Sequence, residues 1–300
     1  MPVTREEFIA LEGNIKEHVN SYFEKKDDYI TPFYTIENDV VAQQTYTTAG
    51  AMGKMTEWGG TVAYDTFSYG YSKQIRYTKY STGLQVPIEL VEEKEYKKIK
   101  SLTASMNHGI LKTLRYYSGL LFEQAFSTGI FTGPDSAALC SASHHNVPGD
   151  TAQSNTNTLE LNYDNLETTQ LAMCNFTDDK GDKMEVELDL VIAGPALRRT
   201  CEQLFGSDKE AYTADNQKNY YKGTKYYIHP HITGNKWFGA NEDLMKEELR
   251  WWMRRDPRNI QRDGDIAKGD FDTEMLSWKA VGSWKQYWIN WWFIYGNNAS

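Results

Sequence analysis

The sequence predicts a mixed α+β fold, and two changes of pattern along the chain carry that prediction. Apolar and polar residues alternate through Phe67, Tyr69 and Tyr71 and again from Leu84 to Leu90, which is the period of a half-buried strand. From Ile99 onward the apolar residues recur at steps of three and four, the period of an amphipathic helix. Shorter strands and helices follow, and residues 162–265 read as a compact unit of their own.

The first expected element is an amphipathic helix over residues 4–26. Thr4 is a candidate N-cap with Glu7 at capping-box distance, and Phe8, Leu11 and Ile15 lie on one apolar stripe. Extended chain should follow to about Tyr46, and a glycine-rich stretch comes next. We therefore expect an N-terminal arm over residues 1–54, with its stripe in contact with another subunit.

An extended β-hairpin loop is expected over residues 55–90, with a kink at Ser81-Thr82-Gly83. A hairpin so rich in Tyr and Lys has little local core to cover it, so its natural cover is another copy of the same chain. Deleting about residues 68–82 should then leave a folded subunit that no longer assembles. The residues expected at contacts between subunits are Tyr69, Tyr71, Lys73, Arg76, Tyr77 and Tyr80.

A single long helix is predicted from about residue 92 to residue 127, on the order of 50 Å in length. Its apolar stripe consists of Ile99, Leu102, Met106, Ile110, Leu114, Tyr117 and Leu121. Beyond it, the patterns predict helices over Tyr163–Asn175 and Ala196–Phe205 and strands over Met184–Ile192, Tyr226–Ile232 and Trp288–Tyr295.

Composition narrows the classes of function. The 300 residues carry a net charge of −9, which disfavours tight binding to a phosphate backbone, and 14% of them are aromatic, a type favoured at buried interfaces. No apolar run has the length of a membrane span, and Met1–Leu11 contains no hydrophobic segment typical of a secretion signal. We therefore expect no membrane partner and a protein that stays in the cytoplasm of the cell that makes it.

Catalytic and metal motifs give little support for an enzyme. His144-His145 and the pair His229 and His231 are the candidate metal ligands, and a cytoplasmic metal-dependent hydrolase using them is the rival hypothesis. Pro230 and the lack of a Cys or acidic partner at metal-site spacing favour a structural role for these histidines. We expect no catalytic residue, no metal and no cofactor.

Three segments together resemble the major capsid proteins of tailed bacteriophages. Tyr77-Thr-Lys-Tyr-Ser-Thr-Gly-Leu-Gln-Val-Pro-Ile-Glu-Leu-Val-Glu-Glu before the long helix resembles their extended loop and the start of their spine helix. Leu139–Asn146 resembles the His- and Asn-containing segment after that helix, and Leu188–Phe205 resembles the strand, turn and helix of their axial domain. The pattern covers most of residues 55–210 in the right order.

The resemblance implies a fold with an N-terminal arm, an extended loop, a peripheral domain holding the spine helix, and an axial domain. Mapped onto this chain, the peripheral domain covers residues 91–161 and 266–300, and the axial domain covers residues 162–265. Some relatives cross-link through a loop lysine and an asparagine of a neighbour. Lys73 and Lys79 lie on the loop here, but no asparagine partner can be named.

The function that the resemblance implies is that of a self-assembling, non-enzymatic subunit of an icosahedral shell. Hexamers and pentamers of the chain would enclose double-stranded DNA without sequence-specific contacts, within a virion assembled in the cytoplasm of the host bacterium. Separate scaffold and portal proteins are the expected partners. The shell of an encapsulin, a bacterial nanocompartment with the same architecture, is the alternative that the sequence leaves open.

Overall fold

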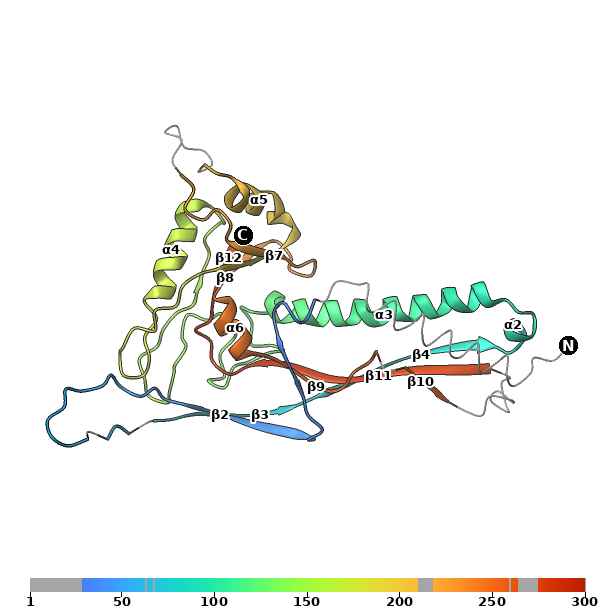
Figure 1. Ribbon diagram of the computed structural model, residues 1–300, viewed down its shortest axis with the longest axis horizontal. Helices are drawn as coiled ribbons and strands as arrows, with labels where there is room; N and C mark the ends of the chain where they lie inside the picture. Colours follow the sequence, from blue (N-terminus) through green and yellow to red (C-terminus); the bar gives the residue numbers. More distant parts are fainter. Residues whose placement is uncertain are drawn as a thin grey trace.

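Two β-sheets, a long helix and a projecting hairpin organise the chain (Figure 1). The computed structural model describes residues 29–62, 64–66, 68–209, 218–258, 260–263 and 275–299. The helix expected over residues 4–26, with Phe8, Leu11 and Ile15, therefore lies outside the described residues. The mixed α+β fold class is confirmed.

The first sheet is long and narrow, and the long helix lies along one of its faces (Figure 1). Its strand order is β1-β9-β11-β10, and β4 pairs with β11 as well. The strands are β1 (Thr35–Asn38), β4 (Thr78–Pro87), β9 (Leu249–Arg255), β10 (Ile260–Asp263) and β11 (Met275–Trp288). Alternate residues of β11, among them Trp278 and Trp284, are buried on the side of the helix.

The long helix, α3, spans Tyr96–Glu123, which corresponds to about 42 Å. It is shorter than predicted because a separate turn, α2 (Glu89–Glu92), precedes it, and the positive φ of 58° at Lys94 interrupts the helical path between them. Five residues of the expected stripe are buried, and Leu102 and Tyr117 are half-buried. The buried five are Ile99, Met106, Ile110, Leu114 and Leu121.

The second sheet has the strand order β5-β12-β8-β6-β7 and is flanked by two helices (Figure 1). Its strands are β5 (Thr156–Asn157), β6 (Leu190–Ala193), β7 (Lys225–Ile228), β8 (Asn235–Ala240) and β12 (Ile294–Ala299). The helices are α4 (Tyr163–Cys174), capped by the Asn162 side chain, and α5 (Arg198–Gly206), which follows the 3-10 turn Pro195–Leu197. Helix α6 (Glu242–Glu248) leads from β8 into β9 of the first sheet.

One hydrophobic core joins the two sheets. Phe122 of α3 packs edge-on against Phe33, and its ring centroid lies 5.7 Å from that of Phe238 of β8. The same buried cluster contains Trp251 and Trp284 of the first sheet. The segment just before β1 is thus part of the subunit's own core and holds α3 against both sheets.

An extended hairpin is present, but its strands differ from those predicted. β2 (Gln43–Ala49) and β3 (Tyr69–Arg76) pair antiparallel, whereas β4, the expected return strand, pairs with β11 along its whole length. Among the described residues β3 and β4 share no ladder. The expected kink at Ser81-Thr82-Gly83 is also wrong, because the β4–β11 ladder runs through Gly83 without a register shift.

Three predicted strands are shorter or interrupted. The strand expected over Tyr226–Ile232 ends at Ile228, as β7. Of Met184–Ile192, only the end belongs to β6. Val186 and Leu188 are buried, but the Leu188 amide donates to Gln170 Oε1, 2.8 Å away, instead of joining a ladder. The expected last strand, Trp288–Tyr295, contains a turn between β11 and β12, and buried aromatic side chains on that turn produce the strand-like pattern.

The sheets divide the chain differently from the ranges expected for the two domains. β9 lies within residues 162–265, yet it pairs with β11 of the first sheet. β12 lies within residues 266–300, yet it pairs with β8 of the second sheet. β9 and β12 lie in these sheets because the chain passes from one sheet to the other through α6 and through the turn after β11.

Candidate assembly surfaces

The connection between β2 and β3 carries the most exposed large apolar side chains of the hairpin. Met55 is 96% exposed, Tyr64 91% and Trp58 70%. Together with Met52 and Val62 they form a surface that we call the loop tip. Figure 1 shows this connection extending beyond the body of the subunit at the lower left. A cluster of exposed apolar side chains of this kind is typical of a protein–protein contact.

The other end of the hairpin is anchored on the first sheet. The hydroxyls of Tyr46 and Tyr287 both donate to Glu37 Oε2, at 3.0 and 2.6 Å, and the two rings lie 4.4 Å apart. Burial is the main cause that raises the pKa of Tyr46 to about 12. Ile75 of β3 packs with the buried Trp252. The hairpin is thus attached to the first sheet at its base, whereas the apolar side chains of the loop tip are exposed to solvent.

The residues predicted at contacts between subunits occupy three kinds of position. Tyr69 is 81% exposed, and Arg76, whose Nε donates to Gln43 Oε1, is exposed as well. Tyr71 is half-buried beside Thr48. Tyr77 lies under the Arg254 guanidinium, 4.8 Å from its ring centroid. Contact with a neighbouring subunit stays a prediction for all of them.

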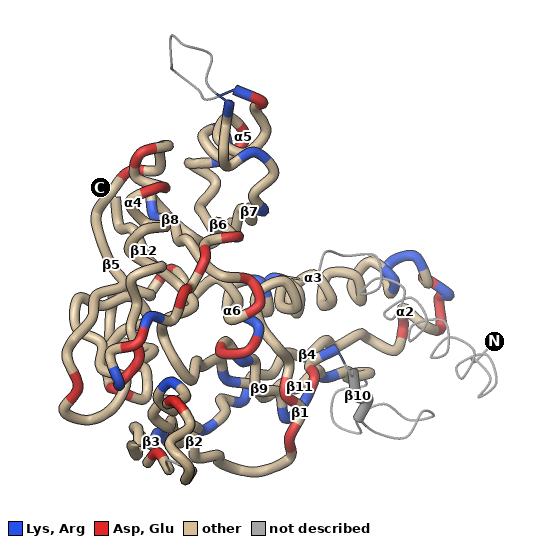
Figure 2. The backbone as a smooth tube through the Cα atoms, turned by 60° about the vertical axis from the view of Figure 1, so that its left-hand side comes forward, with Lys and Arg blue, Asp and Glu red and all other residues tan. Residues whose placement is uncertain are grey.

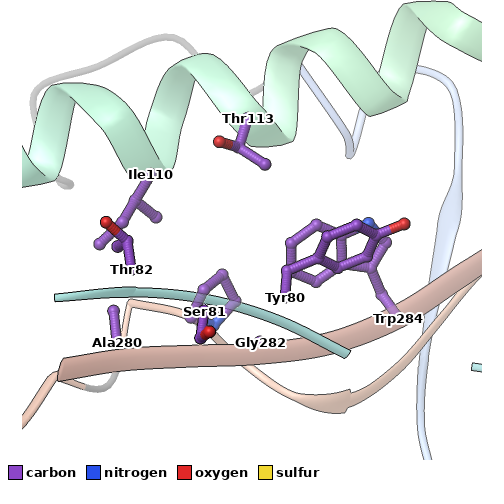
Figure 3. Close-up of a pocket in the computed structure, with 9 residues that line it drawn as sticks. Tyr80, Ser81, Thr82, Ile110, Thr113, Ala280, Gly282 and Trp284 are labelled. Carbon is purple, nitrogen blue, oxygen red and sulfur yellow. The ribbon is translucent and has the colours of Figure 1, made fainter. Parts of the chain in front are cut away.

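Tyr80 and Lys73 make their contacts inside the subunit. The Tyr80 ring stacks on Trp284 with centroids 4.3 Å apart, and Figure 3 shows the two rings together beneath α3. The Lys73 ammonium donates to Thr132 Oγ1 at 2.6 Å and to nearby carbonyls. Burial, with the Lys285 charge second, lowers the pKa of Lys73 to about 8.

The histidines weighed as metal ligands lie in two places, His144 with His145 and His229 with His231, whose ring centroids are 5.8 Å apart. His144 is fully buried, with Nδ1 2.6 Å from Asp135 Oδ2 and its ring stacked on Trp291. His145 Nδ1 lies 2.7 Å from the Asp150 carbonyl oxygen. His229 Nε2 lies 3.0 Å from Ser118 Oγ on α3. Within the described ranges, no three His, Cys, Asp or Glu side chains come together as metal ligands would.

The charged residues of both signs are interspersed over the chain. Figure 2 shows acidic and basic residues next to one another around α2, α6 and the β2–β3 hairpin. Paired examples are Lys236 with Glu123 at 2.7 Å and Lys246 with Glu242 at 2.7 Å. Among the described helices, none has the length and apolar composition of a membrane span.

The loop tip was missed by the sequence patterns. Residues 55–64 were placed within the extended loop expected over residues 55–90, but none of them was named as a contact. Met52, Met55, Trp58 and Val62 follow at steps of three and four, but Gly53, Gly59 and Gly60 among them disfavour a helix. A usable signal was nevertheless present. Large apolar residues placed among several glycines have no regular element to give them a core face, and such residues point to an intermolecular contact.

Comparison with known proteins gives one family and a set of similar structures. Residues 151–232 match the family described as Mu-like prophage major head subunit gpT. No curated protein sequence matches the chain. The matched segment runs from the loop before β5 through α4, β6 and α5 to just beyond β7.

Solved capsid structures are similar over nearly the whole chain. The procapsid protein of bacteriophage JBD30 is 14% identical with a TM-score of 0.54, covering 99% of this chain and 77% of that one. The virus-like particle from Pyrococcus furiosus is 10% identical with a TM-score of 0.53, covering 95% and 98%. The capsid of an empty GTA particle is 10% identical with a TM-score of 0.55, covering 92% and 91%.

The fold defines the class of protein: this chain has the fold of solved capsid proteins, among them those of bacteriophage JBD30 and of an empty GTA particle. The resemblance seen in the sequence is confirmed. Within that class, its residues 151–232 are similar to the major head subunit of Mu-like prophages.

Proposed function

We propose that this chain is the repeating subunit of an icosahedral shell that encloses double-stranded DNA, and that the loop tip is a principal contact between copies. The observation that supports this proposal is the bare apolar loop tip on a body with the capsid fold. Large apolar side chains held away from their own core lose their contact with water only when another surface covers them.

When this one contact is repeated by symmetry, it gives a closed shell. Each copy offers its loop tip to a neighbour and receives the tip of another, so the contact is heterologous and repeats around rings. Hexamers and pentamers are the rings that close an icosahedral shell. Because every subunit makes several such contacts at once, individually modest interfaces give a durable particle.

The sheets suggest roles for the two parts of the subunit. We assign the first sheet with α3 to the peripheral domain and the second sheet with α4 and α5 to the axial domain. Of residues 1–54, we keep the part before β2 as the proposed arm, although Phe33 packs into the subunit's own core and β1 pairs with β9. The extended loop is redefined here as the β2–β3 hairpin with its connection.

The net charge of −9 suits a wall that does not hold DNA tightly. We further propose that assembly takes place in the cytoplasm of the host bacterium with separate scaffold and portal proteins, and that the chain has no catalytic activity. Gel retardation of duplex DNA tests the first point. The purified subunit should not retard DNA at physiological salt, and retardation there would contradict the proposal.

The assembly role is tested by substituting the loop tip. Met55→Ser combined with Trp58→Ser should leave the far-ultraviolet circular dichroism and the unfolding midpoint unchanged, because both side chains are exposed in the subunit. Negative-stain images should then show shells for the unaltered protein and none for the double variant. Ile130→Ser, at an apolar position 53% exposed outside the hairpin, is the matched control and should assemble. Normal shells from the double variant would contradict the proposal.

A nanocompartment shell is the second candidate, favoured by the similarity to the virus-like particle of Pyrococcus furiosus over 95% of this chain. The contents of particles from the native host distinguish the two. A phage head protects a DNA genome from nuclease and carries a portal, whereas a nanocompartment contains a cargo protein. Nuclease-treated particles that yield protein cargo and no DNA would favour the second candidate.

A further inference from the structure

The turn at Asp178–Asp182 contacts both limbs of the connection that carries the loop tip. This turn follows α4, and its backbone is closed by its own hydrogen bonds. Asp178 Oδ1 accepts the amides of Lys180 and Asp182 at 2.9 and 2.8 Å, and Gly181 adopts a φ of +82°. Because Asp178 closes the turn, the side chains of Asp179, Lys180 and Asp182 are available for contacts outside it.

Each of these three side chains binds the loop. Asp179 Oδ1 accepts the amide of Ala51 at 2.6 Å. Lys180 Nζ donates to Asp65 Oδ1 at 3.3 Å and to the Thr66 carbonyl at 3.0 Å. Asp182 Oδ1 lies 2.6 Å from Lys54 Nζ. We call these contacts the loop bracket.

Two further features show that the loop is built for this position. Asp65 Oδ2 accepts the Gly53 amide at 2.6 Å, which joins the outgoing and returning limbs to each other. Gly50 lies so close to Asp179 that a Cβ there would displace the carboxylate from its present position. The bonds from the Gly53 amide and from Lys180 also lower the pKa of Asp65.

We propose that the loop bracket holds the loop tip in its binding position on the free subunit and so prepares it for a second copy of the chain. The inference rests on the proposed function. The bracket pairs are partly exposed, with side-chain exposures of 28% and 37% for Lys180 and Asp65, so their effect on the fold is small. The bracket pairs instead order the connection between β2 and β3. A connection that is ordered before binding loses less conformational freedom when it binds.

A charge-swap cycle tests the bracket. Lys180→Asp and Asp65→Lys each place like charges together, and the double variant restores an opposite pair. Hydrogen exchange of residues 50–66 is measured on subunits kept unassembled by Trp58→Ser. In each single variant, residues 50–66 should exchange about fivefold faster than in the parent. In the double variant, their exchange rate should return toward that of the parent. Unchanged exchange in both single variants would overturn the proposal.

A matched control is the exposed pair of Lys222 and Asp208, far along the chain from the loop. Lys222→Asp should leave the exchange of residues 50–66 unchanged, and acceleration there would overturn the specific role of the bracket.

Assembly is then followed by light scattering without Trp58→Ser. Single bracket variants should assemble several-fold more slowly, and rates equal to that of the parent would overturn the preparatory role. The exchange experiment uses free subunits, so it tests the bracket even if the chain forms no shells. The assembly experiment tests the proposed function separately.

Discussion

Gly119 marks the place where α3 meets both the second sheet and the segment before β1. The His229 ring lies so close that a Cβ at Gly119 would overlap its Cε1 and Nδ1 atoms. One residue earlier, Ser118 accepts the Tyr34 hydroxyl on its carbonyl at 2.6 Å, and its hydroxyl lies 3.0 Å from His229 Nε2. The small residues at these two positions let two other parts of the chain approach the helix.

Gly119→Ala should therefore destabilise the subunit by about 1 to 3 kcal/mol, since the added methyl group displaces a buried ring in a packed core. Gly109→Ala on the same helix is the matched control. A Cβ there meets nothing within 4 Å, so the helix should gain about 0.5 to 1 kcal/mol. Denaturant unfolding of the unassembled subunits measures both. Equal effects of the two substitutions would contradict the packing described at Gly119.

His229 predicts a loss of stability in acid. Burial, with the His231 charge second, lowers its pKa from 6.5 to about 4, so the unfolded chain takes up a proton at a higher pH than the folded one. The stability that neutral His229 contributes is complete above pH 6.5 and falls as the pH drops toward 4. Between pH 7.5 and pH 5 this residue should cost the fold about 2 kcal/mol.

Substituting His229 by Gln should remove about 2 kcal/mol of the difference in unfolding free energy between those two pH values. The comparison uses free subunits, so that assembly does not enter. A pH dependence that is the same in the His229 variant and the parent would show that this histidine titrates normally in the fold.

Among the elements, β4 differs most from its predicted position, because it pairs with β11 and was expected to pair within the hairpin. It forms ten residue pairs with β11, from Pro87 opposite Met275 to Thr78 opposite Trp284, and it contributes Tyr80 to the core. Deleting residues 68–82 removes β3 and half of β4. That deletion should therefore yield an unfolded or insoluble chain, contrary to the expectation from sequence.

A smaller deletion isolates the loop tip. Replacing residues 54–64 by two glycines removes Met55, Trp58, Val62 and Tyr64 but leaves β2, β3 and β4 in place. The free energy of unfolding should change by less than about 1 kcal/mol, because shortening a surface loop has a small effect. Size-exclusion chromatography should show a folded subunit without shells. Unfolding of this variant would mean that the connection belongs to the subunit's core.

The helices were predicted more accurately than the strand pairing. The stripe from Ile99 to Leu121 is a local feature, so sequence spacing predicted α3 to within four residues at each end. The bounds predicted for α4 differ from those observed by one residue. Strand partners are not local. The alternation at Leu84 and Val86 predicts a strand, but the same alternation suits β3 or β11 as a partner. The aromatic run at the C-terminus misled in another way, because Trp291 and Phe293 are buried in a turn.

At the scale of the whole molecule, the order of segments predicted more than any single motif did. The capsid fold was expected from three segments in the right order, and the similar structures confirm it. The residues predicted at contacts between subunits stay a prediction. Tyr80 and Lys73 were placed at subunit contacts from their residue types alone, whereas burial within the subunit depends on β11 and on the Thr132 segment, which lie far away in sequence.

A cryo-electron microscopy map of assembled particles tests the central claim most directly, because it shows what covers the loop tip. We expect Met55 and Trp58 of each copy to lie buried against a neighbouring copy, while Lys180 still contacts Asp65 of its own chain. A map in which the tip remains in solvent, or folds back onto its own subunit, would contradict the account.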